Sequence, residues 1–321
     1  MKRYLSTSIF LVVVMLTLIL SSVSVSAQTT FLSMGTGESS GTYYYLGAGF
    51  AKIVEEYYPE IRINAQPTDA SFENGRLLVS GDLDIGWACV GTASTLHEQE
   101  GLDISDLQMI GIGHRSDVHI MTLNKEYKTV KDFIGSGARI AVGPHGSATK
   151  VLFNHFLLVD GLGLVEGEDY IPVYYSFSEA ERGLKEGTVD VAITAAGFPL
   201  PGVIDMASTN KVYFIDIPDD VLETMIKKRP YVKPLIIPKE TYAGMEKDNQ
   251  TFYMRQTIMC RKEIPEDVVY KICKAIFEHP EEKNAIHPQA ALWNLEDLDG
   301  LDDELPIHPG ALKFYQEKGA W

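Results

Sequence analysis

The chain of 321 residues has few cysteines, and their spacing excludes the common metal and redox motifs. Cys89, Cys260 and Cys273 are odd in number, and no two of them have zinc-ligand or redox spacing. In an oxidising compartment Cys260 and Cys273 could form one disulfide. We favour three buried thiols, since a free cysteine behaves as a small apolar core residue. We expect no metal and no other cofactor.

Basic residues are also scarce. The chain has 28 Lys and Arg against 44 Asp and Glu, which gives a formal net charge of -16. No run of Lys and Arg exceeds three residues. A nucleic-acid binder needs a basic surface to neutralise phosphates, so this class is excluded, and an anionic membrane surface is not an obvious partner. The excess of acid is typical of a soluble protein.

Signatures of catalysis are absent as well. There is no Gly-x-Ser-x-Gly elbow, no His-Glu-x-x-His and no Rossmann glycine triplet. Four histidines, His114, His119, His145 and His155, are scattered along the chain. The acidic segment 296–304 does not have the ligand spacing of an EF-hand, and we expect it to be a solvated turn. We therefore expect a protein that is not an enzyme.

The one long apolar run lies at the N-terminus. Lys2 and Arg3 precede the run Ile9–Leu20, and Val25-Ser26-Ala27 supplies small residues for a signal peptidase. Twelve residues are too few to span a bilayer comfortably, although an uncleaved anchor is the alternative. We predict that residues 1–27 form a signal peptide and that the protein is exported to the periplasm.

Short apolar runs alternate with amphipathic stretches in the rest of the chain. Strands are expected at 31–34, 61–65, 85–89, 107–112, 139–142, 171–175, 189–194 and 212–215. Helices are expected at 47–57, 71–80, 149–160, 177–186, 202–208, 219–228 and 266–277. This alternation predicts an α/β fold with mostly parallel sheets.

An internal repeat predicts two similar lobes. The pattern R-x-L-x-x-G-x-x-D occurs at 76–84 and again at 182–190, each time before an apolar strand. Upstream of each copy, a strand runs into a turn rich in glycine and hydroxyl groups. We expect a signal peptide at 1–27, lobe 1 at 28–122, lobe 2 at 123–250 and a return to lobe 1 at 251–321. The chain would cross between the lobes near 119–123 and 251–259.

Candidate ligand-binding residues lie where strands of the two halves end. In open α/β sheets the carboxyl ends of strands bind ligands, and a helix N-terminus with free N–H groups attracts an anion. The alternative at each turn is an ordinary helix N-cap. Trp87 could equally be a core residue or a wall of the cleft. The candidates are Gly37, Ser40, Gly41, Thr42, Tyr43, Tyr44, Thr68, Ser71, Asn74, Trp87, Gly146, Ser147, Thr149, Thr194, Gly197 and Pro199.

Four segments together resemble the TAXI family of solute receptors, which serve TRAP transporters. They are the turn at 35–44, the stretch from Thr68 to Asp84, the turn at 143–149 and the C-terminal 307–319. The resemblance implies a two-lobed periplasmic-binding-protein fold, in which a cleft closes on a small carboxylate such as a glutamate-like amino acid or a dicarboxylate. It also implies delivery to a TRAP-type membrane permease. We expect a monomer.

Two departures from the family pattern leave the solute open. The chain has Trp87-Ala88-Cys89-Val90-Gly91 after Asp84, and Ala148-Thr149 after Ser147. One alternative function is the binding protein of an ATP-driven transporter, or a sensor, for another small anion. An exported hydrolase is a further alternative, but no nucleophile and base stand close together in the sequence.

Overall fold

The computed structural model describes residues 29–37, 39, 42–145 and 147–321. The predicted signal peptide and the candidates Ser40, Gly41 and Gly146 therefore lie outside the described residues. The strands are β1 Thr30–Gly35, β2 Ile61–Gln66, β3 Ile85–Cys89, β4 Leu107–Thr122, β5 Arg139–Ala141, β6 Ile171–Val173, β7 Val191–Ala195, β8 Tyr213–Phe214, β9 Lys233–Ile237 and β10 Asn249–Arg261. The helices are α2 Thr42–Tyr57, α3 Ser71–Ser80, α4 Thr92–Glu100, α5 Phe177–Glu186, α6 Pro201–Thr209, α7 Asp219–Lys228, α8 Glu266–Glu278, α9 Pro280–Ile286 and α10 Pro309–Glu317. Two short 3₁₀ helices, η1 Val130–Phe133 and η3 Pro288–Leu292, and the π-helix η2 Thr149–Gly161 complete the set.

The strands form one continuous ten-stranded sheet, whose two halves meet at the long strands β10 and β4. The strand order is β2-β1-β3-β10-β4-β7-β5-β6, with β9 on β10 and β8 on β4. Strand β1 pairs in parallel with β2 and β3, and β5 pairs in parallel with β6 and β7. Strands β4 and β10 are antiparallel to each other and to their other neighbours. The α/β fold is confirmed, but the expectation of mostly parallel sheets is wrong, because β4 and β10 cross between the lobes in opposite directions.

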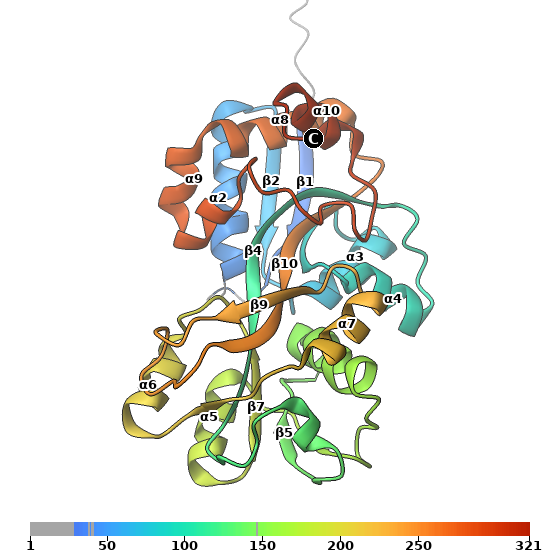
Figure 1. Ribbon diagram of the computed structural model, residues 1–321. Helices are drawn as coiled ribbons and strands as arrows, with labels where there is room; N and C mark the ends of the chain where they lie inside the picture. The colour runs from blue at the N-terminus through green and yellow to red at the C-terminus, as the bar shows by residue number, and fades with distance from the viewer. Residues whose placement is uncertain (1–28, 38, 40–41, 146) are drawn as a thin grey trace, which may run out of the picture.

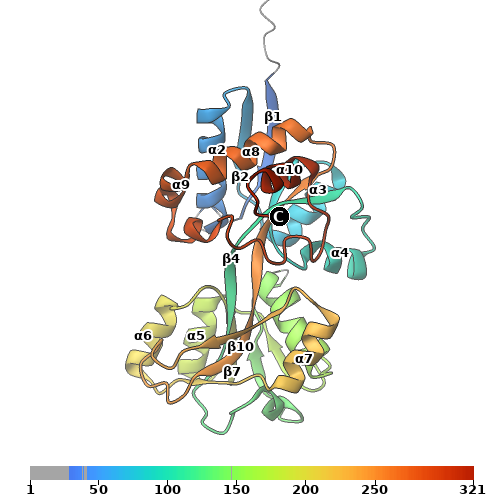
Figure 2. The ribbon, with the colours of Figure 1, turned by 45° about the horizontal axis from the view of Figure 1, so that its top comes forward.

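Strands β4 and β10 connect the two lobes (Figures 1 and 2). Residues 107–117 of β4 pair with β10, and Val118–Met121 pair with β7 of the second lobe. Strand β10 pairs with β9 through Asn249–Tyr253 and with β3 through Gln256–Cys260. We propose that the lobe boundaries fall inside these two strands, so that the lobes are joined by a two-stranded ribbon.

The repeated sequence pattern has the same structural role in both lobes. Gly81 and Gly187 end α3 and α5 in the left-handed conformation, with φ of 84° and 71°. A carboxylate three residues later then fixes the following strand to the first strand of its lobe. Asp84 accepts 2.8 Å hydrogen bonds from the amide and hydroxyl of Ser33, and Asp190 accepts a 2.8 Å bond from the Arg139 amide. The strand orders of the two lobes, β2-β1-β3-β10 and β6-β5-β7-β4, also match, so the correspondence extends to the whole lobe.

The C-terminal segment packs on the first lobe. The Tyr315 hydroxyl in α10 donates a 2.6 Å hydrogen bond to the Ile110 carbonyl in β4. Helix α10 approaches α8 so closely that a Cβ on Gly310 would lie 2.1 Å from the Glu266 carbonyl oxygen. The acidic segment 296–304 was expected to be a solvated turn. The structure corrects this for Glu304, which accepts 2.7 Å hydrogen bonds from the amides of Gly91 and Ser94 at the start of α4. Burial raises the pKa of Glu304.

Most of the expected elements are present. Four of the expected ranges, 85–89, 71–80, 177–186 and 219–228, coincide with β3, α3, α5 and α7. Helices α4, α9 and α10 and strand β9 were not expected. All three cysteines are buried free thiols.

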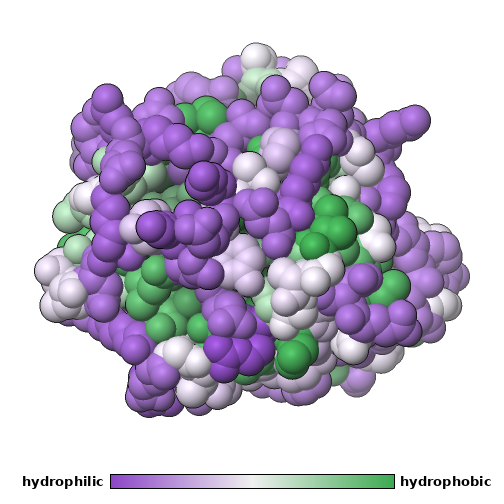
Figure 3. All heavy atoms as spheres, turned by 60° about the horizontal axis from the view of Figure 1, so that its bottom comes forward, coloured by the Kyte–Doolittle hydropathy of each residue, from purple (hydrophilic) through white to green (hydrophobic). Residues whose placement is uncertain are grey.

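The exposed surface at the second-lobe end of the molecule is largely hydrophilic, with separate hydrophobic patches (Figure 3). Within the described part of the chain, no helix combines the length and the apolar character needed to cross a bilayer.

Candidate ligand-binding cleft

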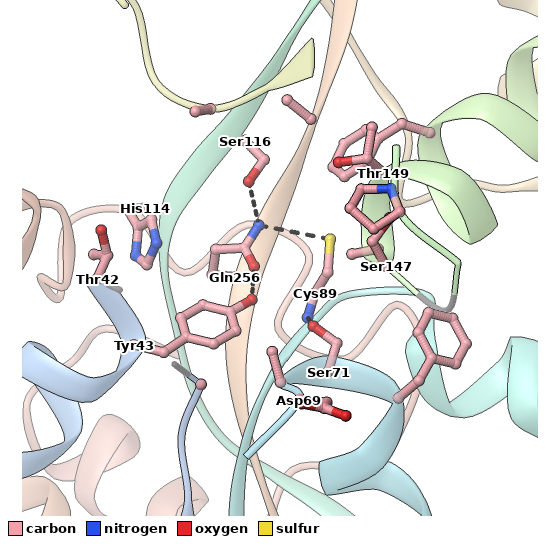
Figure 4. Close-up of a pocket in the computed structure, with 18 of the residues that line it drawn as sticks. Thr42, Tyr43, Asp69, Ser71, Cys89, His114, Ser116, Ser147, Thr149 and Gln256 are labelled. Atoms are coloured by element: carbon pink, nitrogen blue, oxygen red, sulfur yellow. Dashed lines mark hydrogen bonds between the residues drawn. The ribbon is translucent and has the colours of Figure 1, made fainter. Parts of the chain in front are cut away.

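A cavity of about 1120 Å³ lies between the lobes. The first lobe lines it with residues of α2 and α3, and the second lobe with residues 144–145, 147–149 and 195–197. The connecting strands contribute His114, Arg115 and Ser116 from β4 and Gln256 from β10 (Figure 4). A bound molecule would therefore touch both lobes and the ribbon that joins them.

Four helices begin at the wall of this cavity. Their first residues, Thr42 of α2, Ser71 of α3, Thr149 of η2 and Phe177 of α5, all line it. The first turn of a helix has N–H groups without a partner inside the helix and the positive end of the helix dipole. Some of these amides are capped, since Ser147 Oγ accepts from the Lys150 amide at 3.2 Å and Ser176 caps α5. Two helix starts come from each lobe, so their partial positive charges converge on one space. This arrangement favours a negatively charged group in the cavity.

A chain of hydrogen bonds joins the first lobe to the connecting strands. The Tyr43 hydroxyl donates to Gln256 Oε1, and Gln256 Nε2 donates to Ser116 Oγ at 2.8 Å and to Cys89 Sγ at 3.6 Å (Figure 4). Burial raises the pKa of Tyr43, so its proton stays on the hydroxyl. Because Ser116 Oγ accepts the Gln256 bond, its own O–H proton remains for a ligand.

His114 is a second neutral donor at the cavity wall. Trp293 Nε1 donates a 3.1 Å hydrogen bond to His114 Nδ1, and an indole nitrogen can only donate. Burial lowers the pKa of His114 to about 3, so the ring is neutral at physiological pH. With Nδ1 accepting, the single ring proton lies on Nε2. His114 thus offers an N–H group without bringing a charge.

The formal charges on the described cavity lining cancel. Two arginines, Arg76 and Arg115, stand against the acids Asp69 and Glu73. Each arginine also forms an ion pair with an acidic residue that does not line the cavity. Arg76 binds Glu100 through two hydrogen bonds, and Arg115 Nε lies 3.2 Å from Asp117 Oδ1. In the described lining, then, neutral donors and helix ends would hold an anion, without an unpaired cation.

Seven of the sixteen predicted site residues line the cavity. They are Gly37, Thr42, Tyr43, Ser71, Ser147, Thr149 and Gly197. Six others do not: Tyr44, Thr68, Asn74, Trp87, Thr194 and Pro199. Ser40, Gly41 and Gly146 are outside the described residues. Ligand contact by any of them stays a prediction.

Several of the six support the cavity from behind. Asn74 Nδ2 donates to the carbonyls of Thr36 at 2.7 Å and Trp87 at 2.8 Å, and Thr68 Oγ1 donates to Asn74 Oδ1 at 2.7 Å. Asn74 thereby links the end of β1 to β3 through these hydrogen bonds. Trp87 is a core residue with no exposed surface, and Thr194 is buried in β7. Each has an anchoring or packing role in this arrangement.

The sequence did not point to the cavity residues on β4 and β10. His114, Arg115, Ser116 and Gln256 lie in the middle of long strands, without glycine turns or helix starts nearby. They reach the cleft because the two strands cross between the lobes at this point. Gln289, after α9, also lines the cavity. The lone His114 was the only signal available in the sequence. No group of three or more potential metal ligands occurs among the described residues.

The two lobes, the connecting strands and the cleft together define the fold of the two-lobed solute-binding proteins. The chain belongs to the NMT1-like family, whose family model matches residues 34–319. The narrower TAXI family is not shown by this match and stays a prediction.

Solved structures share this architecture. XAC2383 from Xanthomonas citri bound to ATP has a TM-score of 0.55 and 11% identity, and the alignment covers 90% of this chain and 96% of that one. The same protein bound to chloride ion has a TM-score of 0.51 and 12% identity over the same shares. The periplasmic aliphatic sulphonate binding protein SsuA from Escherichia coli has a TM-score of 0.47 and 16% identity, with coverage of 89% and 82%. At these identities the likeness to the two XAC2383 structures shows the fold alone.

Proposed function

We propose that the protein is an extracytoplasmic solute receptor that captures a small carboxylate between its lobes and presents it to a membrane transporter. The observation that carries this proposal is the cleft into which two helix N-termini from each lobe converge. A periplasmic location, reached through the predicted signal peptide, belongs to the same proposal.

The charges of the cleft favour a ligand with a single anionic group. The formal charges of the described lining cancel, and helix ends together with neutral donors contribute partial charges only. The lining has no net formal charge to balance an anionic group, so each further charge on the ligand adds to the cost of desolvation. We therefore place a monocarboxylate or a zwitterionic amino acid ahead of a dicarboxylate.

Closure of the lobes gives the proposed function its mechanism. A ligand that contacts both lobes binds the closed form more tightly than the open form, so it shifts the population toward closure. The ribbon of β4 and β10 is the bending element, since both strands run from one lobe to the other. A transporter would then recognise the closed shape.

The class of transporter is part of the proposal. The sequence resemblance implies a TRAP-type permease driven by an ion gradient. The TRAP-type partner depends on membership of the TAXI family, which the family match does not reach. We therefore propose an ATP-driven transporter as the first choice of partner and a TRAP-type permease as the second. Transport of the ligand in proteoliposomes that contain the cognate permease separates the two, because one needs ATP and the other an ion gradient.

A thermal-shift screen of small anions tests the proposal. The panel contains L-glutamate, 2-oxoglutarate, L-alanine, acetate, lactate and methanesulfonate. At least one carboxylate is expected to raise the Tm by several degrees, and the double variant Thr42→Ala, Ser147→Ala is expected to abolish this shift. The matched control, Ser208→Ala with Thr224→Ala, removes two hydroxyls outside the cleft and should respond as the wild type does.

Failure of the screen has a plain meaning. If no carboxylate raises the Tm, and mass spectrometry of the purified protein finds no co-purified acid, the carboxylate assignment is wrong. If a carboxylate binds equally well to the cleft variant and to the wild type, the position of the site is wrong.

A further inference from the structure

A second cavity, of about 620 Å³, lies in the second lobe at the ends of the connecting strands. Its wall is made of Lys125, Tyr127 and Lys128, which follow β4, residues 211–214, which include β8, and residues 244–249, which lead into β10. None of these residues lines the cleft between the lobes. The volume is in the range of small-molecule pockets, which span roughly 300–1,000 Å³.

The wall of this cavity is basic, although the chain as a whole is acidic. Four lysines line it, against two acids, Glu246 and Asp248, on a chain with a net charge of -16. Lys211 Nζ lies 2.8 Å from Glu246, and Lys247 is paired with Asp216. Within the described residues, Lys125 and Lys128 form no ion pair. Two ammonium groups therefore remain to attract an anion.

Aromatic rings form the apolar part of the wall. Tyr127, Tyr213 and Phe214 line the cavity. The Phe214 ring stacks on Tyr242, with centroids 5.2 Å apart, and this contact fixes its orientation. Lys211 Nζ lies 5.8 Å from the centre of the Tyr213 ring. Flat, fixed rings beside cations suit a ligand that joins a charged group to an apolar body.

Asn249 adds an unsatisfied acceptor. Its Nδ2 donates to the Ile215 carbonyl at 3.1 Å and to Asp216 Oδ1 at 2.8 Å, so the orientation of the amide is set. Only 1% of the residue is exposed, and its Oδ1 has no hydrogen-bond partner in the described part of the chain. A buried polar atom without a partner is rare and costly. This oxygen has almost no accessible surface, so a donor from a ligand would satisfy it after a shift of the neighbouring side chains.

We propose that this cavity is a second binding site, which takes a small organic anion with an aromatic or apolar body and an O–H or N–H donor. Lys125 and Lys128 hold the anionic group, and the rings of Tyr127, Tyr213 and Phe214 hold the body. Asn249 Oδ1 accepts from the donor once the wall has shifted around the ligand. The site is independent of the cleft and does not rest on the proposed receptor function.

Isothermal titration with three related probes tests this site. 4-Hydroxybenzoate has the anion, the ring and the donor; benzoate lacks the donor, and 4-hydroxybenzamide lacks the charge. 4-Hydroxybenzoate should bind with one-site stoichiometry, at least threefold more tightly than benzoate and at least tenfold more tightly than 4-hydroxybenzamide. Lys125→Gln with Lys128→Gln should weaken its binding at least tenfold. The control, Lys52→Gln with Lys227→Gln, removes two exposed lysines that line neither cavity and should leave binding unchanged.

Three results would overturn the proposal. The first is no saturable binding of 4-hydroxybenzoate to the wild type. The second is equal binding to the Lys125/Lys128 variant and to the control variant. The third is loss of binding in the cleft variant Thr42→Ala, Ser147→Ala, which would place the probe between the lobes. Because these outcomes do not depend on the Tm screen, the second site and the receptor function fail separately.

Discussion

Trp293 Nε1 donates a hydrogen bond to His114 Nδ1 at 3.1 Å, from the C-terminal segment of the chain to a strand that connects the lobes. The bond fixes the ring proton of His114 on Nε2, at the wall of the cleft. The Trp293 ring also packs against Trp87, with centroids 4.8 Å apart, so the donor is held in the core of the first lobe. A core residue thereby determines what kind of hydrogen bond the cleft can offer.

Trp293→Phe should weaken binding of the cleft ligand about twofold. Without the indole N–H, the proton of His114 is free to occupy either nitrogen, and half of the donor capacity toward the cleft is lost. Nitrogen-15 NMR of the imidazole reads the tautomer directly, and the variant should show a mixture. Trp87→Phe is the matched control, since its Nε1 contacts Met34 Sδ at 3.3 Å and not a histidine. A single Nε2–H tautomer in Trp293→Phe would contradict the prediction.

Acid should destabilise the fold through two buried histidines. Burial lowers the pKa of His114 to about 3 and that of His119 to about 4, against an ordinary value of 6.5. Between about pH 4 and 6.5 the unfolded chain binds protons that the native state refuses, so the free energy of unfolding falls as the pH falls. At pH 5 each group contributes a loss of roughly 2 kcal/mol relative to neutral pH.

Urea denaturation of the wild type and of His114→Gln at pH 7.5 and pH 5 measures this effect. Glutamine keeps an acceptor for Trp293 but does not titrate, so the variant should lose less stability on acidification than the wild type. Equal losses would show that His114 is not protonated on unfolding in this range, against the prediction.

Asp84→Asn and Asp190→Asn should each destabilise the protein by about 1–3 kcal/mol, the usual range for hydrogen bonds to a charged group. Each carboxylate accepts hydrogen bonds from the first strand of its lobe, and Arg139 also lowers the pKa of Asp190. Chemical denaturation measures both variants. The exposed Asp82 provides the control, and Asp82→Asn should change the stability by less than about 0.5 kcal/mol. Effects equal to that of Asp82→Asn would show that the repeated aspartates do not fasten the strands.

The three thiols should be unreactive in the native protein. Burial raises the pKa of Cys89, Cys260 and Cys273, which keeps them as thiols, and the thiolate is the reactive form. Titration with a thiol reagent should find almost no rapid reaction in buffer and three thiols in guanidinium chloride. One reactive thiol in guanidinium chloride would instead indicate a disulfide between Cys260 and Cys273.

Local signals in the sequence predicted the lobes better than they predicted the cleft. The pattern around Asp84 and Asp190 could be recognised in the sequence, because the glycine that ends the helix and the aspartate that binds the neighbouring strand lie only three residues apart. The helix starts at Ser71 and Thr149 were predicted from the sequence, whereas the first helix was expected from Gly47 and begins at Thr42. His114 and Gln256 were not predicted as cleft residues, because their place in the cleft depends on where two distant strands cross. The polar helix α4 was missed because it lacks a clear apolar face, and Glu304 at its start comes from far along the chain.

Strand β10 also determines the order in which the molecule can be completed. It lies between β3 and β4 in the sheet of the first lobe, although nearly the whole second lobe precedes it in the sequence. The first lobe therefore cannot close its sheet until about four-fifths of the chain has been synthesised. Contacts that join such distant segments make folding slow, and they leave apolar strand edges exposed in the meantime. For a protein of this topology, a chaperone that holds the unfinished chain would be an advantage.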